Sequence, residues 1–202
     1  MVNLAKIGIP EDFSGKTWES FKDIKDYLDE DETIDYRKVL KVAKNWEKAI
    51  IEKSSVLGLF LYGHNGSGKT TIACLLLLTF KKQGRDVLRI TMTKLQQDFY
   101  EEWRIPEIAL FRGVLFIDEV GKEYKTKQEH SEILLEYVLK YRAERRLVTI
   151  LASNSDIKYL NQRYGATVNS ILKGKFLPLA FPEVDLRQRT VGDEINKIIG
   201  ED

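Results

Sequence analysis

Residues 61–71, LYGHNGSGKTT, constrain the fold more than any other stretch, because they lie between two apolar runs. The run before them, residues 56–61, predicts a buried strand that ends near a glycine. The run after them predicts a helix over residues 69–83. A glycine-rich loop between a strand and a helix lets successive backbone N–H groups face one point, and the helix N-terminus adds a partial positive charge. The stretch therefore predicts a site for the phosphates of a nucleotide.

The loop matches the pattern G-x-x-x-x-G-K-[ST] over residues 63–70. We expect Lys69 to reach the β- and γ-phosphates, and the Thr70 hydroxyl to be a ligand of Mg²⁺. The cofactors predicted from this loop are ATP and Mg²⁺. The residues expected to bind the nucleotide are Gly63, His64, Asn65, Gly66, Ser67, Gly68, Lys69, Thr70 and Thr71.

A second chemical signal is VLFIDEV, residues 114–120, in which four apolar residues lead into two acids. Ligands of open parallel sheets bind at the carboxyl ends of the strands, which is where these acids would lie. Asp118 is expected to hold Mg²⁺ partly through water, and Glu119 to act as the general base on the attacking water. Asn154 ends the apolar run of residues 147–154 and is a candidate for orienting that water, although an Asn that begins a turn is equally common.

Predicted strands and helices alternate along the rest of the chain. The predicted strands are residues 56–63, 86–92, 113–121, 147–154 and 176–181. The predicted helices are residues 69–83, 93–103, 127–146 and 156–174, the last of which is expected to form one or two helices. A further helix is expected to begin at about Asp35. Strands that are apolar throughout predict an α/β fold with a mostly parallel five-stranded sheet flanked by helices. We expect an acidic N-terminal linker and helix (residues 1–50), a core (51–190) and a C-terminal tail (191–202).

Charge and composition narrow the functional classes. The 202 residues carry a net charge of +1, but residues 11–35 hold ten acidic residues and three lysines, a net −7, so the remainder sums to +8. This distribution is compatible with polyanion binding by the main body and equally with two ordinary solvated surfaces. The chain shows neither the roughly 18-residue apolar run of a membrane helix nor the apolar core of a signal peptide. We therefore expect a cytoplasmic protein with no membrane partner.

The nucleotide motifs also exclude one class of protein and favour another. A GTPase would need a guanine-reading N-K-x-D segment, and the sequence contains none. A small-molecule kinase remains possible. Asp118 and Glu119 end one predicted strand, and the polar Asn154 ends the next. This arrangement favours an ATPase that acts on macromolecules.

Two further segments, GIPEDFSGKTWESF (residues 8–21) and VDLRQR (184–189), complete a family resemblance. With the nucleotide motifs, in this order and spacing, they resemble the AAA+ P-loop NTPase core of bacterial helicase loaders of the DnaC/DnaI type, with the IstB transposition ATPases as relatives. The resemblance covers roughly residues 8–190. It implies ATP hydrolysis in DNA replication, a replicative DNA helicase and single-stranded DNA as partners, and self-assembly through AAA+ interfaces.

The same resemblance implies roles for individual residues. Residues 9–21 would wrap the adenine side of the nucleotide. Asn154 would be the sensor-1 residue, and Arg187 the sensor-2 arginine that reaches the γ-phosphate, with Arg189 a less suitable substitute. Lys69, Arg187, Asn154 and Glu119 are therefore the expected catalytic set.

The sequence departs from the family in two places. The family usually carries a finger arginine after R-[FY]-G, which reaches the site of a neighbouring subunit. Here Ser170 and Ile171 occupy that region, Arg163 is the nearest arginine, and we expect slow hydrolysis. Only seven residues precede GIPEDF, so either the chain is a truncated core or its partner contact lies elsewhere, for example in the acidic residues 22–35.

Basic and aromatic residues supply candidate DNA contacts. The candidates are Lys122, Lys125 and Lys127 after the acidic strand, Arg142, Arg145 and Arg146 at a helix end, and the ring-bearing Phe99, Tyr100 and Trp103. Each of these three groups has an ordinary explanation that is equally good or better. The lysines fit a solvated loop, the arginines fit the dipole at a helix end, and the rings fit core packing. The rival functions are a transposition helper that binds duplex DNA, a nucleotide-gated adaptor with little hydrolysis, and a variant that competes for a host's helicase system.

Overall fold

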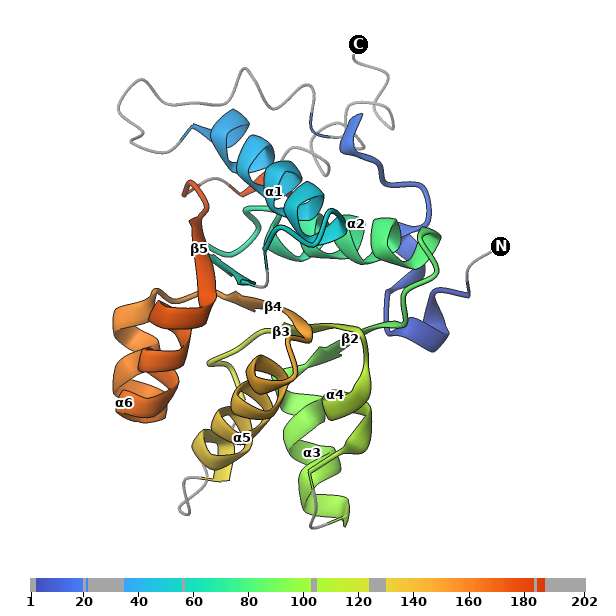
Figure 1. The fold of residues 1–202 in the computed structure, drawn as a ribbon. Coiled ribbons are helices and arrows are strands. Elements are labelled where there is room, and N and C mark those ends of the chain that lie inside the picture. Colours follow the sequence, from blue (N-terminus) through green and yellow to red (C-terminus); the bar gives the residue numbers. More distant parts are fainter. Residues whose placement is uncertain are drawn as a thin grey trace, which may run out of the picture.

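The computed structural model describes residues 3–19, 21, 35–55, 57–102, 105–123, 130–183 and 185–187. A five-stranded sheet lies at the centre, between helices (Figure 1). Its strands are β1 (Gly58–Tyr62), β2 (Val87–Thr91), β3 (Val114–Asp118), β4 (Val148–Ser153) and β5 (Phe176–Ala180). The order is β2-β3-β4-β1-β5, and all four pairings are parallel. The predicted α/β class and five-stranded sheet are confirmed.

The helices follow the predicted alternation, with one addition. They are α1 (Tyr36–Ile51), α2 (Lys69–Lys82), α3 (Met92–Glu102), α4 (Glu107–Phe111), α5 (His130–Glu144) and α6 (Ile157–Lys175). Helix α4 was not predicted, because five residues are too few to show a helical period. Helix α6 bends at Gly165, whose φ is 74°, so the prediction of one or two helices is confirmed as a kinked pair. None of the helices that the structure describes is long and apolar enough to cross a membrane.

The three inner strands β1, β3 and β4 are buried on both faces, which explains why they read as continuous apolar runs. The edge strand β5 is only partly buried, and its Pro178 is exposed. Along β1, Leu59 and Leu61 belong to one hydrophobic cluster, and Phe60 belongs to the other. The first cluster lies under α1 and α2, and the second lies under α3, α5 and α6. Figure 1 shows α1 and α2 on one side of the sheet and α3 to α5 on the other.

The N-terminal residues pack onto the face covered by α2. The 3₁₀ turns η1 (Ala5–Ile7) and η2 (Glu11–Phe13) and helix α1 place Ile9, Phe13 and Trp46 in the same buried cluster as α2. Helix α1 begins after Asp35, whose carboxylate accepts a hydrogen bond from Arg37 N at 2.9 Å, as an N-cap does. This packing brings η2 to the edge of the sheet where β1, β3 and β4 end. The acidic segment 22–34 and the predicted tail 191–202 lie outside the described residues.

Candidate nucleotide-binding site

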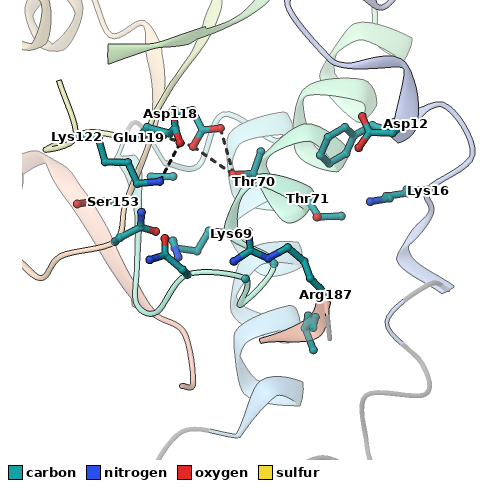
Figure 2. A pocket seen from close by; sticks show the side chains of 17 residues that line it. Asp12, Lys16, Lys69, Thr70, Thr71, Asp118, Glu119, Lys122, Ser153 and Arg187 are labelled. Atoms are coloured by element: carbon teal, nitrogen blue, oxygen red, sulfur yellow. Dashed lines mark hydrogen bonds and ion pairs between the residues drawn. The ribbon is translucent and has the colours of Figure 1, made fainter. Parts of the chain in front are cut away.

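The carboxyl ends of the parallel strands border a cavity of about 370 Å³ (Figure 2). The strand register aligns Tyr62 of β1 with Ser153 of β4, and Thr91 of β2 with Asp118 of β3, so the strand ends meet at one edge. The cavity is lined by residues of the glycine-rich loop, by the ends of β3 and β4, and by both ends of the described chain. The predicted site residues that line the cavity are Asn65, Gly66, Gly68, Lys69, Thr70, Thr71, Asp118, Glu119, Asn154 and Arg187.

The glycine-rich loop has the backbone conformation that a phosphate cradle requires. Gly66 and Gly68 have φ values of 79° and 88°, a region that residues with a Cβ rarely adopt. A Cβ at Gly68 would lie 2.5 Å from Tyr36 Oη, and one at Gly66 would collide with the carboxylate of Asp185. The Tyr36 hydroxyl also donates a hydrogen bond to Ser67 O at 3.0 Å, which fixes the loop to α1. The loop therefore fits the phosphates of a nucleotide.

Lys69 lies across this loop. Its ammonium group donates hydrogen bonds to Gly63 O at 2.9 Å, His64 O at 2.6 Å and Ser67 Oγ at 3.2 Å. Burial lowers the pKa of Lys69 to about 8; the charge of Asp118 opposes this shift, whereas the positive charges of Lys122 and Arg187 add to it. A buried ammonium group among carbonyl oxygens is well placed to bind an entering polyphosphate.

This pKa predicts how nucleotide affinity depends on pH. A phosphate binds the protonated form of Lys69, so above a pKa of about 8 binding requires the uptake of a proton. We expect the affinity for Mg²⁺·ATP to be nearly constant from pH 7 to 7.5 and to weaken between pH 8 and 9.5, approaching about tenfold per pH unit. Calorimetric titration across this range measures the effect. An affinity that does not change up to pH 9.5 would contradict the assignment of Lys69.

The corner predicted to bind the metal is formed by Thr70 and Asp118. The Thr70 hydroxyl donates to Asp118 Oδ2 at 3.1 Å, and the Asp118 side chain is almost fully buried. Arg89 of β2 neutralises this carboxylate, with Nη2 at 2.8 Å and Nε at 3.2 Å from Oδ2. The two oxygen groups are the hard ligands that Mg²⁺ prefers, so the corner fits the predicted metal.

Arg89 is a residue of this site that the sequence did not predict. Besides Asp118, its guanidinium group binds Gly8 O at 3.1 Å. The side chain thus connects the metal corner to the N-terminal segment. The sequence held one signal of it, an arginine inside the otherwise apolar and hydroxyl-bearing run 87–92, VLRITM.

Glu119 has a strained backbone at the end of β3. Its φ of 58° is in the left-handed region, which is unusual for a residue with a side chain and is often found at functional sites. Its amide donates to Asp118 Oδ1 at 2.9 Å, and its carboxylate accepts from Lys122 Nζ at 2.9 Å. Lys122, a predicted DNA contact, therefore lies in this cavity, beside the candidate general base. Lys125 and Lys127 lie outside the described residues.

The opposite walls of the cavity come from the end of β4 and from the C-terminal part of the described chain. Asn154 directly follows β4, where Ser153 Oγ donates to Val120 O at 2.7 Å and so joins this turn to the end of β3. Leu186 N donates to Gly66 O at 3.0 Å, which holds the segment 185–187 on the glycine-rich loop. Arg187 lines the cavity, and its hydrogen bonds lower the pKa of Asp185. Arg189 lies outside the described residues.

The N-terminal segment closes the remaining side of the cavity. Asp12, Phe13 and Lys16 line it, and the Lys16 ammonium lies 4.6 Å from the centre of the Phe13 ring. These residues belong to the range that the family resemblance assigns to the adenine side. A ring with a cation above it is a suitable wall for a planar base.

The side chain of Arg163 does not extend into solvent, as an arginine finger for a neighbouring molecule would. Its side chain is 8% exposed, and its guanidinium group forms an ion pair with the buried Glu123 at 2.9 Å. The hydroxyl of Tyr164 binds the same carboxylate. Ser170 and Ile171, which stand where the family has its arginine, lie on α6. Within the described residues, α6 therefore offers no free arginine for a second site.

Some of the other predicted DNA contacts do not lie on the surface of the protein. Arg142 is fully buried and binds backbone carbonyls, so its prediction as a surface contact is wrong. Arg145 and Arg146 are exposed. Phe99 packs partly buried against the second hydrophobic cluster, in agreement with the alternative of core packing, and Trp103 lies outside the described residues.

Known proteins resemble this chain in sequence and in fold. The sequence profile of the ATPase family associated with various cellular activities (AAA) matches residues 59–165. No curated protein sequence matches the chain. Three solved structures show the same fold. The DnaC helicase loader matches with a TM-score of 0.63 at 18% identity, over 81% of this chain and 99% of that one. DnaI matches with a TM-score of 0.63 at 18% identity, over 86% and 91%.

AMPPCP-bound DnaA from Aquifex aeolicus matches with a TM-score of 0.59 at 19% identity, over 82% of this chain. The match covers 52% of DnaA, so this chain spans about half the length of that relative. Identities this low show a shared fold. The family profile, in contrast, covers more than half of the chain and includes the glycine-rich loop, both acids and Asn154. The protein therefore belongs to the AAA family of ATPases.

Proposed function

We propose that this protein is an AAA+ ATPase that loads a replicative DNA helicase, and that it binds Mg²⁺·ATP, single-stranded DNA and the helicase in the cytoplasm. The observation that carries the ATPase part is the convergence of Lys69, Thr70, Asp118 and Glu119 on one cavity. The loader part is supported by the fold, which is shared along nearly the whole of the chains in the solved structures of the DnaC helicase loader and of DnaI.

The proposed reaction is the attack of water on the γ-phosphate of ATP. The water oxygen bonds to the γ-phosphorus, the bond to the β-phosphate oxygen breaks, and ADP and phosphate leave. Glu119 would accept the proton of the water, and Asn154 would orient that water. Lys69 and Arg187 would stabilise the negative charge on the γ-phosphate. Thr70 and Asp118 would hold Mg²⁺, which neutralises charge on the phosphates when it is bound.

Arg89 supports this chemistry by holding the Asp118 carboxylate in position. A buried carboxylate without a cation beside it would be costly, and the Arg89 guanidinium supplies that cation at 2.8 Å. The Asp118 carboxylate in turn accepts hydrogen bonds from Thr70 and from the Glu119 amide. One side chain thus fixes the geometry of both the metal corner and the catalytic glutamate.

The loader role predicts a nucleotide-dependent complex. We expect this protein to co-elute in gel filtration with the replicative helicase of its source in the presence of ATP, and to do so more strongly as a Glu119→Gln variant. In ADP the complex should weaken, because the γ-phosphate contacts of Lys69 and Arg187 are lost. The absence of a complex in every nucleotide state would refute the loader role, while ATP binding by the same sample would leave the ATPase assignment intact.

The nucleotide-gated adaptor is a second candidate, and one observation favours it. Arg163 is held by Glu123, and the family's finger position carries Ser170 and Ile171. A turnover number that stays near zero with helicase and single-stranded DNA present would support the adaptor. A preference for duplex DNA over single strands would instead support the transposition helper.

A further inference from the structure

The negative charge on the γ-phosphate is stabilised during hydrolysis by the cations that surround it. A finger arginine usually adds a cation there and increases the rate of hydrolysis by several orders of magnitude. Here Arg163 is buried against Glu123, and Ser170 and Ile171 carry no charge. Among the described residues, α6 therefore offers no free arginine that could add this cation.

Lys122 is a cation that already lies at the catalytic end of the cavity. Its ammonium group is 2.9 Å from Glu119 Oε1, and its side chain is 46% exposed. Figure 2 shows the side chain reaching along the wall toward Glu119, on the side of the cavity where Lys69 also lies. Lys69 and Lys122 both line this cavity, so the two ammonium groups face the same space.

The backbone on both sides of Lys122 is anchored. Gly121 N donates hydrogen bonds to Glu123 Oε2 at 3.0 Å and to Tyr164 Oη at 2.9 Å. Glu123 is itself buried and paired with Arg163 at 2.9 Å. Arg163 and Tyr164 of α6 thus hold the turn that carries Lys122. A turn fixed in this way can position a flexible lysine without a neighbouring molecule.

We propose that Lys122 is a further catalytic residue of this ATPase, whose ammonium group binds the γ-phosphate from within the same chain. The inference rests on the proposed hydrolysis of ATP. An ammonium group has three N–H donors, so Lys122 can keep its hydrogen bond to Glu119 and donate to a phosphate oxygen at the same time. Because ADP lacks the γ-phosphate, Lys122 should contribute to the binding of ATP and hardly to that of ADP.

Calorimetric titration of a Lys122→Gln variant tests the proposal. With Mg²⁺, the affinity for a nonhydrolysable ATP analogue should fall roughly tenfold to a hundredfold, the range for one charge-assisted hydrogen bond, while the affinity for ADP changes by less than about threefold. The rate of hydrolysis should fall as well. A Lys122→Arg variant should keep most of the preference for the triphosphate, because it retains the charge.

Lys140 offers a matched control. It lies on α5, pairs with Glu136 at 2.8 Å and is 54% exposed, so a Lys140→Gln variant removes a similar ion pair away from the cavity. Equal affinities of Lys122→Gln and wild type for the analogue would overturn the proposal and leave the ATPase intact. Faster hydrolysis by Lys122→Gln would also overturn it, because Lys122 would then only restrain Glu119. A wild-type protein that binds neither nucleotide would overturn the ATPase assignment together with the proposal.

Discussion

Replacement of Glu119 by glutamine is expected to slow ATP hydrolysis by about 10²- to 10⁴-fold, the usual contribution of a general base. Glutamine has the same shape and can still accept the hydrogen bond from Lys122, so the fold and the nucleotide affinity should stay close to wild type. Single-turnover hydrolysis and a binding titration on the same sample measure the two effects. The variant should therefore bind ATP and retain it.

Glu136 provides the control for this variant. It is a carboxylate of α5 that pairs with Lys140 outside the cavity, so Glu136→Gln should hydrolyse ATP at the wild-type rate. If Glu119→Gln kept the full rate, another group would have to accept the proton, and the role of Glu119 would be refuted. A loss of binding as large as the loss of rate would indicate that Glu119 holds the nucleotide instead.

Replacement of Arg142 by methionine is expected to destabilise the fold by about 3 kcal/mol or more, because it leaves several buried acceptors without a donor. The guanidinium group is fully buried and donates to Thr149 Oγ1. It also binds four backbone carbonyls, those of Ala109, Leu110, Arg112 and Val148. Burial lowers the pKa of Arg142 to about 10, so the group is still charged at neutral pH.

Thermal unfolding followed by circular dichroism measures this loss. A destabilisation of about 3 kcal/mol corresponds to a fall of roughly 6–12 °C in Tm for a chain of this size. Arg145, one turn further along, is exposed and lies 3.6 Å from the centre of the Tyr141 ring. Arg145→Met should cost about 1 kcal/mol or less. Equal effects of the two substitutions would show that the carbonyl contacts of Arg142 contribute little.

The parts of the site that lie close together in sequence could be predicted. The loop from Gly63 to Thr70 carries its own geometry, because glycine spacing and the following helix are local features. Asp118 and Glu119 end an apolar strand and were predicted for the same reason. The structure brings most of these residues, together with Asn154 and Arg187, to one cavity. Their catalytic roles stay predictions until the variants are measured.

The contacts between distant segments could not be predicted from local patterns. Arg89 reaches Asp118 only because β2 and β3 are neighbours in the sheet, and the order of strands is not encoded in the period of any one strand. The buried position of Arg142 is equally hidden, since an arginine near the end of a helix is usually solvated or interacts with the helix dipole. In both cases a charge is buried because of partners that tertiary packing supplies.

The cavity is bounded by residues from both ends of the described chain, with Asp12 and Phe13 on one side and Leu186 and Arg187 on another. This arrangement has a consequence for biosynthesis. Contacts between segments so far apart in sequence form late, because closing a long loop costs entropy that the sheet and its helices must first offset. On the ribosome, the glycine-rich loop would be made early, yet its C-terminal wall would be missing until Arg187 had left the exit tunnel. A nascent chain should therefore acquire its full affinity for nucleotide only after Arg187 has emerged.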